Sequence, residues 1–442
     1  MNYPPYHLSK RSRTVIFAFF SLAFLIIAPS IALYTAGYRF DMHTKNFNRI
    51  GVLSIDTLPK DATVYLNNTV VAQHLPLRLT NMTPGTYNLR IEKEGYLSWS
   101  KDIVIEEHKT TYIKDFSLFF KSSPEAIETN ETLLDIFPSS NGNYLIEKFQ
   151  TSTQTQMTLF ATAEERATEI IRDRTGADVS VNWSERSNTA AIIKTAASST
   201  EIMVLKGENP TQISRLPLEG AVTGLNWREN FYRDQLFIRF ENSLYTMDAN
   251  EISKPETLRT TSTLFYRENE GNDWYFDFET KTLTNIQNSN RNIYVGSNLV
   301  REVVDINSTR VILQTNDGLL VIQRDDIQEI KTVPTPNFFY DAVRKEYISW
   351  SPWEVWTIYQ NGEVALLNRM SEAIQQVLAL DDTGALLVIT SNKLLGFNPG
   401  YYVTQEIHGD IMVQKATVDK RTKTIYFLGT WQEKKGLYKL KY

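Results

Sequence analysis

The chain has 442 residues, no cysteine and a formal net charge of −5. This length accommodates two or three domains, and hydrophobic residues, at 42%, suffice to bury their cores. The lack of cysteine excludes disulfides, thiol nucleophiles and cysteine-ligated zinc. A mildly acidic chain is also a poor match to a phosphate backbone, so no nucleic-acid partner is expected.

The first predicted element is a transmembrane helix over residues 14–36. Its core, TVIFAFFSLAFLIIAPSIALY, carries no charge. A bilayer core about 30 Å thick needs about 20 helical residues, so the segment is long enough to span. A cleaved signal peptide and a buried core helix are the alternatives. The apolar run is longer than a cleaved signal peptide needs. It is apolar on every face, which argues against a buried core helix.

Three basic residues predict the orientation of this helix. Lys10, Arg11 and Arg13 precede it, and residues 1–13 contain no acidic side chain. The positive-inside rule then keeps residues 1–13 in the cytoplasm as a short tail and exports the rest. We therefore expect a single-pass protein of the cell membrane with extracytoplasmic C-terminal domains.

Residues 50–120 are predicted to form a small β-sandwich. Apolar and polar residues alternate in short runs, as in YNLRIE from Tyr87 to Glu92, and turn residues such as Pro84-Gly85 separate the runs. Six or seven strands of this kind are typical of two packed antiparallel sheets.

This stretch resembles the PEGA domain, a small bacterial surface module. The motifs that carry the resemblance are Gly51-x-Leu53-x-Ile55, Pro59-Lys60-Asp61-Ala62, Val64-Tyr65-Leu66, Pro84-Gly85-x-Tyr87 and Gly95-Tyr96-x-x-Trp99. Lys60-Asp61 stands where the name-giving motif has Glu-Gly. The resemblance implies a surface-associated structural or adhesive module and no catalyst.

Tyr96 and Trp99 are the candidate contact residues of this module. The pair either covers the edge or core of the sandwich or forms an aromatic platform for a sugar or a partner protein. The pattern favours packing, and ligand contact stays the alternative.

Residues 128–442 are predicted to form a seven- or eight-bladed β-propeller, joined to the sandwich by a linker from Phe119 to Glu128. A large apolar residue, a polar turn and a strand recur about every 40 residues, which fits four-stranded blades. The copies start near Phe137, Trp183, Trp227, Phe265, Val304, Trp350, Leu380 and Val418. A run of β-sandwich domains is the alternative.

The repeat resembles the strand starts of TolB-like and WD40-like propellers. Trp350-Ser351-Pro352 and Trp183-Ser184 show this best. We also expect the last strand, Leu437 to Tyr442, to complete the first blade and close the ring.

No residue pattern indicates an active site. The five histidines do not occur at metal-ligand spacing, and the chain lacks a Gly-x-Ser-x-Gly elbow, a Walker loop and a Gly-x-Gly-x-x-Gly motif. Acidic pairs such as Asp381-Asp382 face apart in a turn and cannot form opposed glycosidase carboxylates. No catalytic residue, cofactor or metal is therefore expected.

These observations predict an all-β, membrane-anchored cell-surface protein without catalytic activity. It would contact the lipid bilayer through residues 14–36 and would bind or scaffold an envelope polymer or a surface protein through its external β domains. The alternative is a glycan-acting or other hydrolytic propeller enzyme, which would need carboxylates that converge in the propeller channel.

Overall fold

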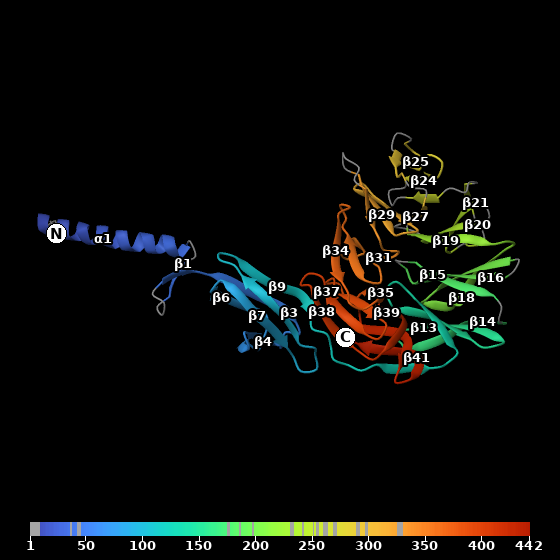
Figure 1. Ribbon diagram of the computed structural model, residues 1–442, viewed down its shortest axis with the longest axis horizontal. Coiled ribbons are helices and arrows are strands. Elements are labelled where there is room, and N and C mark those ends of the chain that lie inside the picture. Colours follow the sequence, from blue (N-terminus) through green and yellow to red (C-terminus); the bar gives the residue numbers. More distant parts are fainter. Residues whose placement is uncertain are drawn as a thin grey trace, which may run out of the picture. The chain divides into compact units, whose positions relative to one another are not determined.

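The structure is a computed structural model, and it describes residues 9–35, 38–41, 46–174, 177–184, 187–196, 199–229, 234–240, 243–250, 252, 256–259, 264–267, 272–288, 292–296, 299–324 and 330–442. The chain divides into two compact units, Met1–Phe119 and Phe120–Tyr442 (Figure 1).

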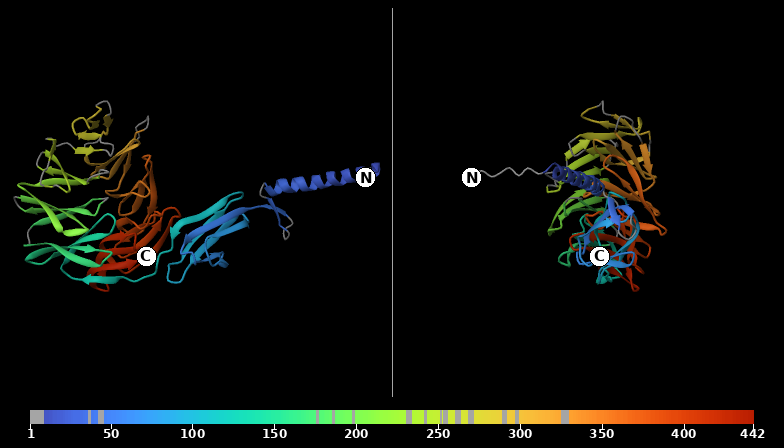
Figure 2. Two further views of the ribbon diagram at one scale, coloured as in Figure 1. Left: turned by 180° about the vertical axis from the view of Figure 1, so that it is seen from behind. Right: turned by 90° about the vertical axis from the view of Figure 1, so that its left-hand side faces the viewer.

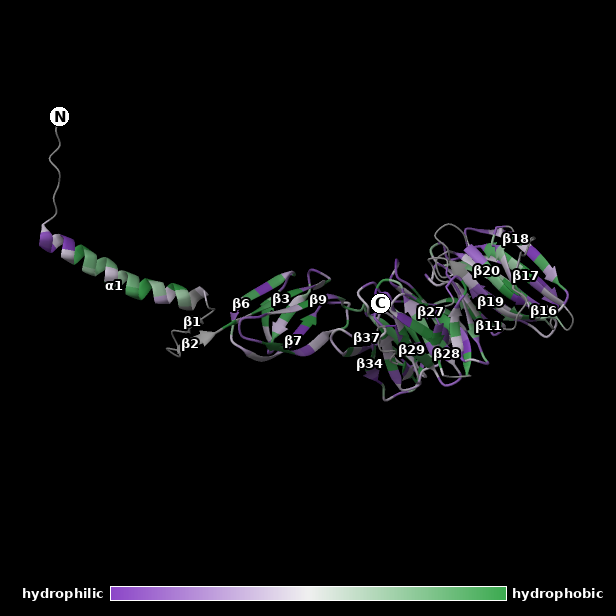
Figure 3. Cartoon of the chain, turned by 90° about the horizontal axis from the view of Figure 1, so that it is seen from above, coloured by the Kyte–Doolittle hydropathy of each residue, from purple (hydrophilic) through white to green (hydrophobic). Residues whose placement is uncertain are grey.

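The first unit begins with helix α1, Lys10–Thr35. The Ser9 hydroxyl caps it by accepting a hydrogen bond from the Ser12 amide at 3.2 Å. The segment Lys10–Ala32 has a mean hydropathy of 2.5, which makes α1 long and apolar enough to cross a membrane. Lys10, Arg11 and Arg13 form its first turn, and Figure 3 shows the hydrophilic start and the apolar remainder.

Two short strands, β1 (Tyr38–Asp41) and β2 (Asn46–Arg49), pair after the helix. A β-sandwich follows. One sheet has β3 (Gly51–Leu58) between β6 (Leu77–Met82) and β9 (Thr110–Ser117), the latter parallel to β3. The other sheet contains, in order, β5 (Thr69–Ala72), β4 (Thr63–Leu66), β7 (Gly85–Glu92) and β8 (Trp99–Ile105).

The sandwich core comes from the alternation that the sequence shows. Leu89 and Ile91 of β7 are fully buried, whereas the intervening Arg90 is not, because successive side chains of a strand point to opposite faces. Leu53 and Ile55 of β3 meet them from the facing sheet and are also fully buried. The predicted β-sandwich is confirmed.

The second unit is a β-propeller with eight four-stranded sheets among its described residues, arranged as blades around a common centre (Figures 1 and 2). Blade 1 is β11 (Leu133–Pro138), β12 (Tyr144–Gln150), β13 (Gln154–Ala161) and β14 (Arg166–Arg174), and blade 2 is β15 (Asp178–Trp183), β16 (Thr189–Ala196), β17 (Ser199–Lys206) and β18 (Asn209–Leu218). Blade 3 is β19 (Val222–Glu229), β20 (Asp234–Phe240), β21 (Ser243–Asp248) and β22 (Glu256–Arg259), and blade 4 is β23 (Leu264–Arg267), β24 (Asp273–Asp277), β25 (Thr282–Asn285) and β26 (Asn292–Tyr294).

The remaining blades repeat this antiparallel order. Blade 5 is β27 (Val300–Ile306), β28 (Arg310–Thr315), β29 (Leu319–Gln323) and β30 (Ile330–Val333), and blade 6 is β31 (Asn337–Asp341), β32 (Glu346–Trp350), β33 (Glu354–Ile358) and β34 (Val364–Arg369). Blade 7 is β35 (Ile374–Ala379), β36 (Leu386–Thr390), β37 (Leu394–Asn398) and β38 (Val403–His408). Blade 8 is β39 (Met412–Asp419), β40 (Thr424–Trp431), β41 (Lys434–Lys441) and β10 (Glu125–Thr129). The first strands of neighbouring blades contact one another, as β11 does with β15 and β39, so these strands surround the axis.

Blade 8 closes the ring with strands from both ends of the unit. The C-terminal segment supplies β39, β40 and β41, and β10 pairs with β41 as the outermost strand. The expected closure by the chain end therefore occurs in blade 8, not in the first blade. Part of the stretch interpreted as a linker is strand, because β10 begins at Glu125.

Two of the repeated tryptophans join neighbouring blades. The Trp183 indole donates to the Phe137 carbonyl of blade 1 at 2.9 Å, and the Trp227 indole donates to the Asn182 carbonyl of blade 2 at 2.9 Å. Trp183 also packs in the apolar layer between blades 1 and 2. The repeated apolar residue thus marks the end of a first strand, where it packs against the preceding blade.

The repeat copy at Trp350 lies in a different hairpin from the other copies. Trp350 ends β32, so Ser351-Pro352 lies in the turn between the second and third strands of blade 6. The turn equivalent to the other copies is Asp341–Lys345, between β31 and β32.

Candidate functional site

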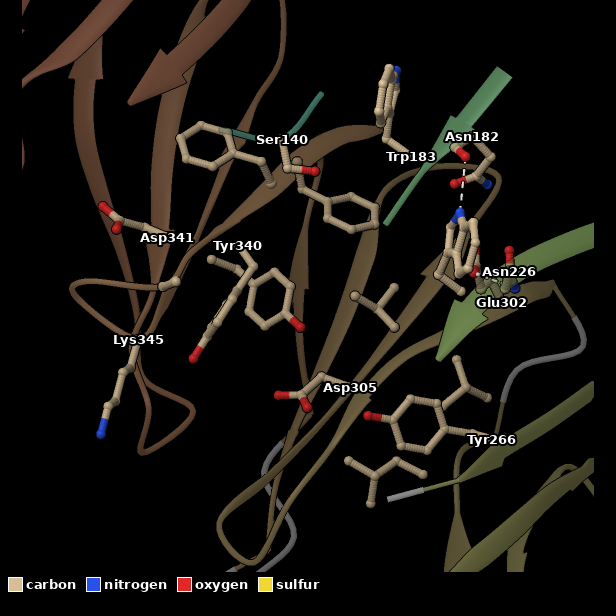
Figure 4. A pocket seen from close by; sticks show the side chains of 18 of the residues that line it. Ser140, Asn182, Trp183, Asn226, Tyr266, Glu302, Asp305, Tyr340, Asp341 and Lys345 are labelled. Atoms are coloured by element: carbon tan, nitrogen blue, oxygen red, sulfur yellow. Dashed lines mark hydrogen bonds between the residues drawn. The ribbon is translucent and has the colours of Figure 1, made fainter. Parts of the chain in front are cut away.

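The centre of the propeller contains a cavity of about 2060 Å³. Residues of all eight blades line it, mostly from the first strands and the turns that follow them. Figure 4 shows part of its wall, with Asn182, Trp183 and Asn226 on one side and Tyr340, Asp341 and Lys345 on the other. This cavity is the candidate functional site.

Two carboxylates of β27, Glu302 and Asp305, line the cavity. They are three residues apart, a spacing that would normally place them on opposite faces of a strand. The register between β27 and β28 shifts between Val303 and Asp305, and this bulge returns Asp305 to the face of Glu302.

Glu302 connects two blades that are not neighbours in the chain. It lies in blade 5 and accepts a hydrogen bond from the Asn226 amide of blade 3 at 3.2 Å. Burial raises its pKa above the ordinary range, although the hydrogen bond from Asn226 and the charge of Arg239 both act to lower it.

Asp305 is held by a buried arginine. Arg310, whose side chain is 2% exposed, donates to Asp305 at 3.0 Å and also to backbone carbonyls of blade 6, including that of Ile358. Burial raises the pKa of Asp305 despite the opposing charge of Arg310 and a hydrogen bond from Tyr266. Asp305 therefore belongs to a network that ties blades 4, 5 and 6 together.

Blade 6 gives the cavity an aromatic wall. Phe338, Phe339, Tyr340 and Tyr347 all line it. The rings of Tyr340 and Tyr347 lie 5.0 Å apart, and the Arg310 guanidinium lies 5.0 Å from the Tyr347 ring. Such contacts fix ring orientations and leave an amphipathic surface toward the cavity.

Basic side chains predominate among the charged residues of this wall. Among the described lining residues, three are acidic, Glu302, Asp305 and Asp341, and seven are basic: Arg239, Arg301, Arg310, Arg324, Lys345, Lys420 and Arg421. The whole chain has the opposite balance, with 46 basic and 51 acidic residues. Three of these cations are ion-paired, Arg310 with Asp305, Lys420 with Asp382 and Arg421 with Asp419, and the described wall still has more basic than acidic side chains.

The side chains of the cavity offer cations, amides and aromatic faces. Within the ranges described, no group of three or more His, Cys, Asp or Glu side chains could hold a metal ion. Burial raises the pKa values of two carboxylates in the cavity, Glu302 and Asp305.

Residues 50–116 match the family model of the PEGA domain. This chain contains a PEGA domain. The sequence resemblance is therefore confirmed for the β-sandwich of the first unit. No curated protein sequence matches the chain.

The PEGA domain contains the two candidate contact residues. Trp99 is 1% exposed and stacks on Phe116, with ring centroids 4.7 Å apart, and Tyr96 is half-buried. These positions give Trp99 a packing role. Contact of Tyr96 and Trp99 with a ligand stays a prediction, and neither residue lines the propeller cavity.

Several solved structures are similar in fold. Apo AztD from Citrobacter koseri shares 10% identity, covers 67% of this chain and 98% of its own, and has a TM-score of 0.39. Hsv2 from Kluyveromyces lactis shares 13%, covers 64% and 98%, and has a TM-score of 0.37. The dihydro-heme d1 dehydrogenase NirN shares 10%, covers 63% and 66%, and has a TM-score of 0.44. Similarities this low carry no argument about ligand or activity.

Sequence reasoning did not find the cavity residues. Their one local signal is the segment Val304–Arg310, VDINSTR, where an acid and a base flank a polar turn. The sequence pattern marks that turn as a repeat copy, and the structure shows that Asp305 and Arg310 pair across it.

Proposed function

We propose that this protein is a non-catalytic, membrane-anchored component of the cell envelope. Helix α1 anchors it in the bilayer with Lys10, Arg11 and Arg13 on the cytoplasmic side, and the PEGA domain and propeller are extracytoplasmic. The external β domains bind or scaffold an envelope component, either a wall polymer or a surface protein.

The observation that carries this proposal is the propeller cavity. A volume of about 2060 Å³ exceeds the roughly 300–1,000 Å³ of ordinary small-molecule pockets, so it suits a segment of a polymer or a protein loop. The PEGA domain at residues 50–116 supports a surface role, since the resemblance to this family implies a surface-associated module.

A sedimentation experiment tests the proposal. The full chain in detergent micelles is mixed with purified cell walls and, separately, with wall-free envelope proteins. Saturable co-sedimentation with walls, or co-purification with one envelope protein, is the expected result. An unrelated single-pass protein in the same detergent serves as the control, and no saturable binding to either preparation refutes the proposal.

The second candidate function is glycan hydrolysis, which one observation favours. Glu302 and Asp305 share a cavity, and burial raises both pKa values, as an acid catalyst requires. Release of reducing ends from cell walls that is abolished by Glu302→Gln would establish this alternative.

A further inference from the structure

We propose that the propeller cavity binds a polyanionic glycan, a chain of sugar rings that carry carboxylate or phosphate groups. The inference rests on the proposed function, since it names the class of envelope component that the cavity takes. Blades 6 and 8 supply the side chains that distinguish this ligand.

The aromatic wall of blade 6 supplies a surface for sugar rings. Tyr340 is 38% exposed, and its ring is supported from behind by Tyr347. Arg310 lies over the Tyr347 ring, so the supporting ring is fixed in turn. A sugar ring can place its apolar C–H face on such a tyrosine while its hydroxyl groups remain available for hydrogen bonds.

Amide side chains from other blades line the same cavity and can bind those hydroxyl groups. An amide offers both donors and acceptors, which suits a ligand rich in hydroxyl groups. The asparagines that line the cavity are Asn141, Asn143, Asn182, Asn226, Asn272, Asn292 and Asn307.

The turns of blades 6 and 8 direct positive charge toward the ligand. In each turn the aspartate is buried and caps the backbone: Asp341 accepts from the Val343 amide at 3.0 Å, and Asp419 accepts from the Arg421 amide at 3.0 Å. Basic residues that follow these aspartates in sequence are exposed. Lys345 is exposed, with no ion pair among the described residues. The Arg421 side chain is 58% exposed and also pairs with Asp419 at 3.4 Å.

The three features together select one ligand class. Cations alone would accept any polyanion, and aromatic and amide groups alone would accept a neutral glycan. Cations beside an aromatic wall and several amides fit sugar rings with anionic substituents. The roughly 1–1.4 kcal/mol expected for one such contact corresponds to a five- to tenfold change in affinity.

A binding experiment with defined probes tests this inference. Titration calorimetry on the full chain in detergent micelles uses oligogalacturonate for carboxylated glycans and phosphomannan oligosaccharides for phosphorylated ones. We expect at least one of them to bind and the affinity to fall with salt. We also expect Lys345→Glu and Tyr340→Ala each to weaken binding about five- to tenfold, and Tyr340→Phe to retain it.

Lys281→Glu is the matched control. Lys281 also ends an aspartate-capped turn with a positive φ of 56°, as Lys345 does with 57°, but it does not line the cavity. Equal binding of uncharged dextran overturns the charge argument. If inorganic polyphosphate binds as tightly as the glycans and Tyr340→Ala does not change its binding, the glycan argument is overturned. If neither anionic glycan binds, the inference as a whole is overturned.

The wall-sedimentation experiment separates this inference from the proposed function. If the wild type and Lys345→Glu sediment equally with walls, the cavity inference fails and the proposed function stands. If the protein captures an envelope protein but does not bind walls, the cavity inference also fails and the proposed function also stands. If neither walls nor envelope proteins bind, both fail.

Discussion

Replacement of Glu147 by Gln should stabilise the propeller above neutral pH. Glu147 lies on β12 of blade 1, is 1% exposed, and accepts a hydrogen bond from Thr158 on the neighbouring strand. It shares a strand face with Leu145, which packs in the apolar layer between blades 8 and 1. Glu128 of β10, the strand that completes blade 8, adds a like charge. The ring is thus closed over a buried carboxyl group.

Burial raises the pKa of Glu147 from 4.5 to about 7. The folded state therefore binds this proton more tightly than the unfolded state, and the free energy of unfolding falls as pH rises between about 4.5 and 7. At 1.36 kcal/mol per pH unit, the charged form costs up to about 3 kcal/mol above pH 7. Glutamine is neutral at every pH, so Glu147→Gln removes this cost. For a unit of about 320 residues, the gain corresponds to a rise in Tm of about 4–5 °C.

Thermal unfolding of the full chain in detergent, followed by tryptophan fluorescence from pH 4 to 9, measures the effect. The difference in Tm between Glu147→Gln and the wild type should be near zero at pH 4.5 and reach its full value by pH 8. Glu169→Gln, an exposed position on β14 of the same blade, should leave the pH profile unchanged. A Tm difference for Glu147→Gln that is the same at pH 4.5 and pH 8 would refute the reasoning.

Three further predictions concern the anchor, the ring closure and the PEGA domain. Because the chain lacks cysteine, Ser100→Cys should react with a membrane-impermeant maleimide in intact cells and Ser12→Cys only after lysis; the reverse labelling contradicts the orientation. Tyr442→Phe removes a buried hydroxyl that donates to a backbone carbonyl of blade 7, so it should lower the free energy of unfolding by about 1–2 kcal/mol. An unchanged denaturation midpoint would contradict a stabilising role for this hydrogen bond. Trp99→Ala should cost the PEGA domain about 3–5 kcal/mol and expose it to limited proteolysis, whereas unchanged stability with lost wall binding would make Trp99 a contact residue.

The transmembrane helix and the β-sandwich could be predicted from the sequence because the signals for both are local. The apolar run of α1 and the two-residue alternation of β7 each need only a short window of residues. The propeller followed from a period of about 40 residues, which survives even where single motifs are degenerate.

The blade boundaries were less predictable for a physical reason. The first and second hairpins of a blade both show an apolar strand end, a polar turn and a new strand. Trp350 therefore matched the repeat although it belongs to a second hairpin, and Asp341–Lys345, the true first turn, lacks a preceding tryptophan. Strand order within a sheet is a long-range property that this pattern does not contain.

The site was unpredictable from spacing because its contacts join distant segments. Asn226 and Glu302 are 76 residues apart, and the side chains that surround them come from eight blades. Asp305 and Arg310 are close in sequence, but their pairing depends on the turn between them.

The charge of the cavity also arises only on folding. In sequence, the turn Asp341–Lys345 contains an acid and bases and has little net charge. In the fold, Asp341 is 3% exposed because its carboxylate caps the turn, whereas Lys345 is exposed. The turn that begins at Asp419 also buries its aspartate fully, but the exposed Arg421 side chain pairs with that aspartate at 3.4 Å. Backbone capping thus buries the acid of each turn and leaves the base at the cavity, an arrangement that composition alone could not reveal.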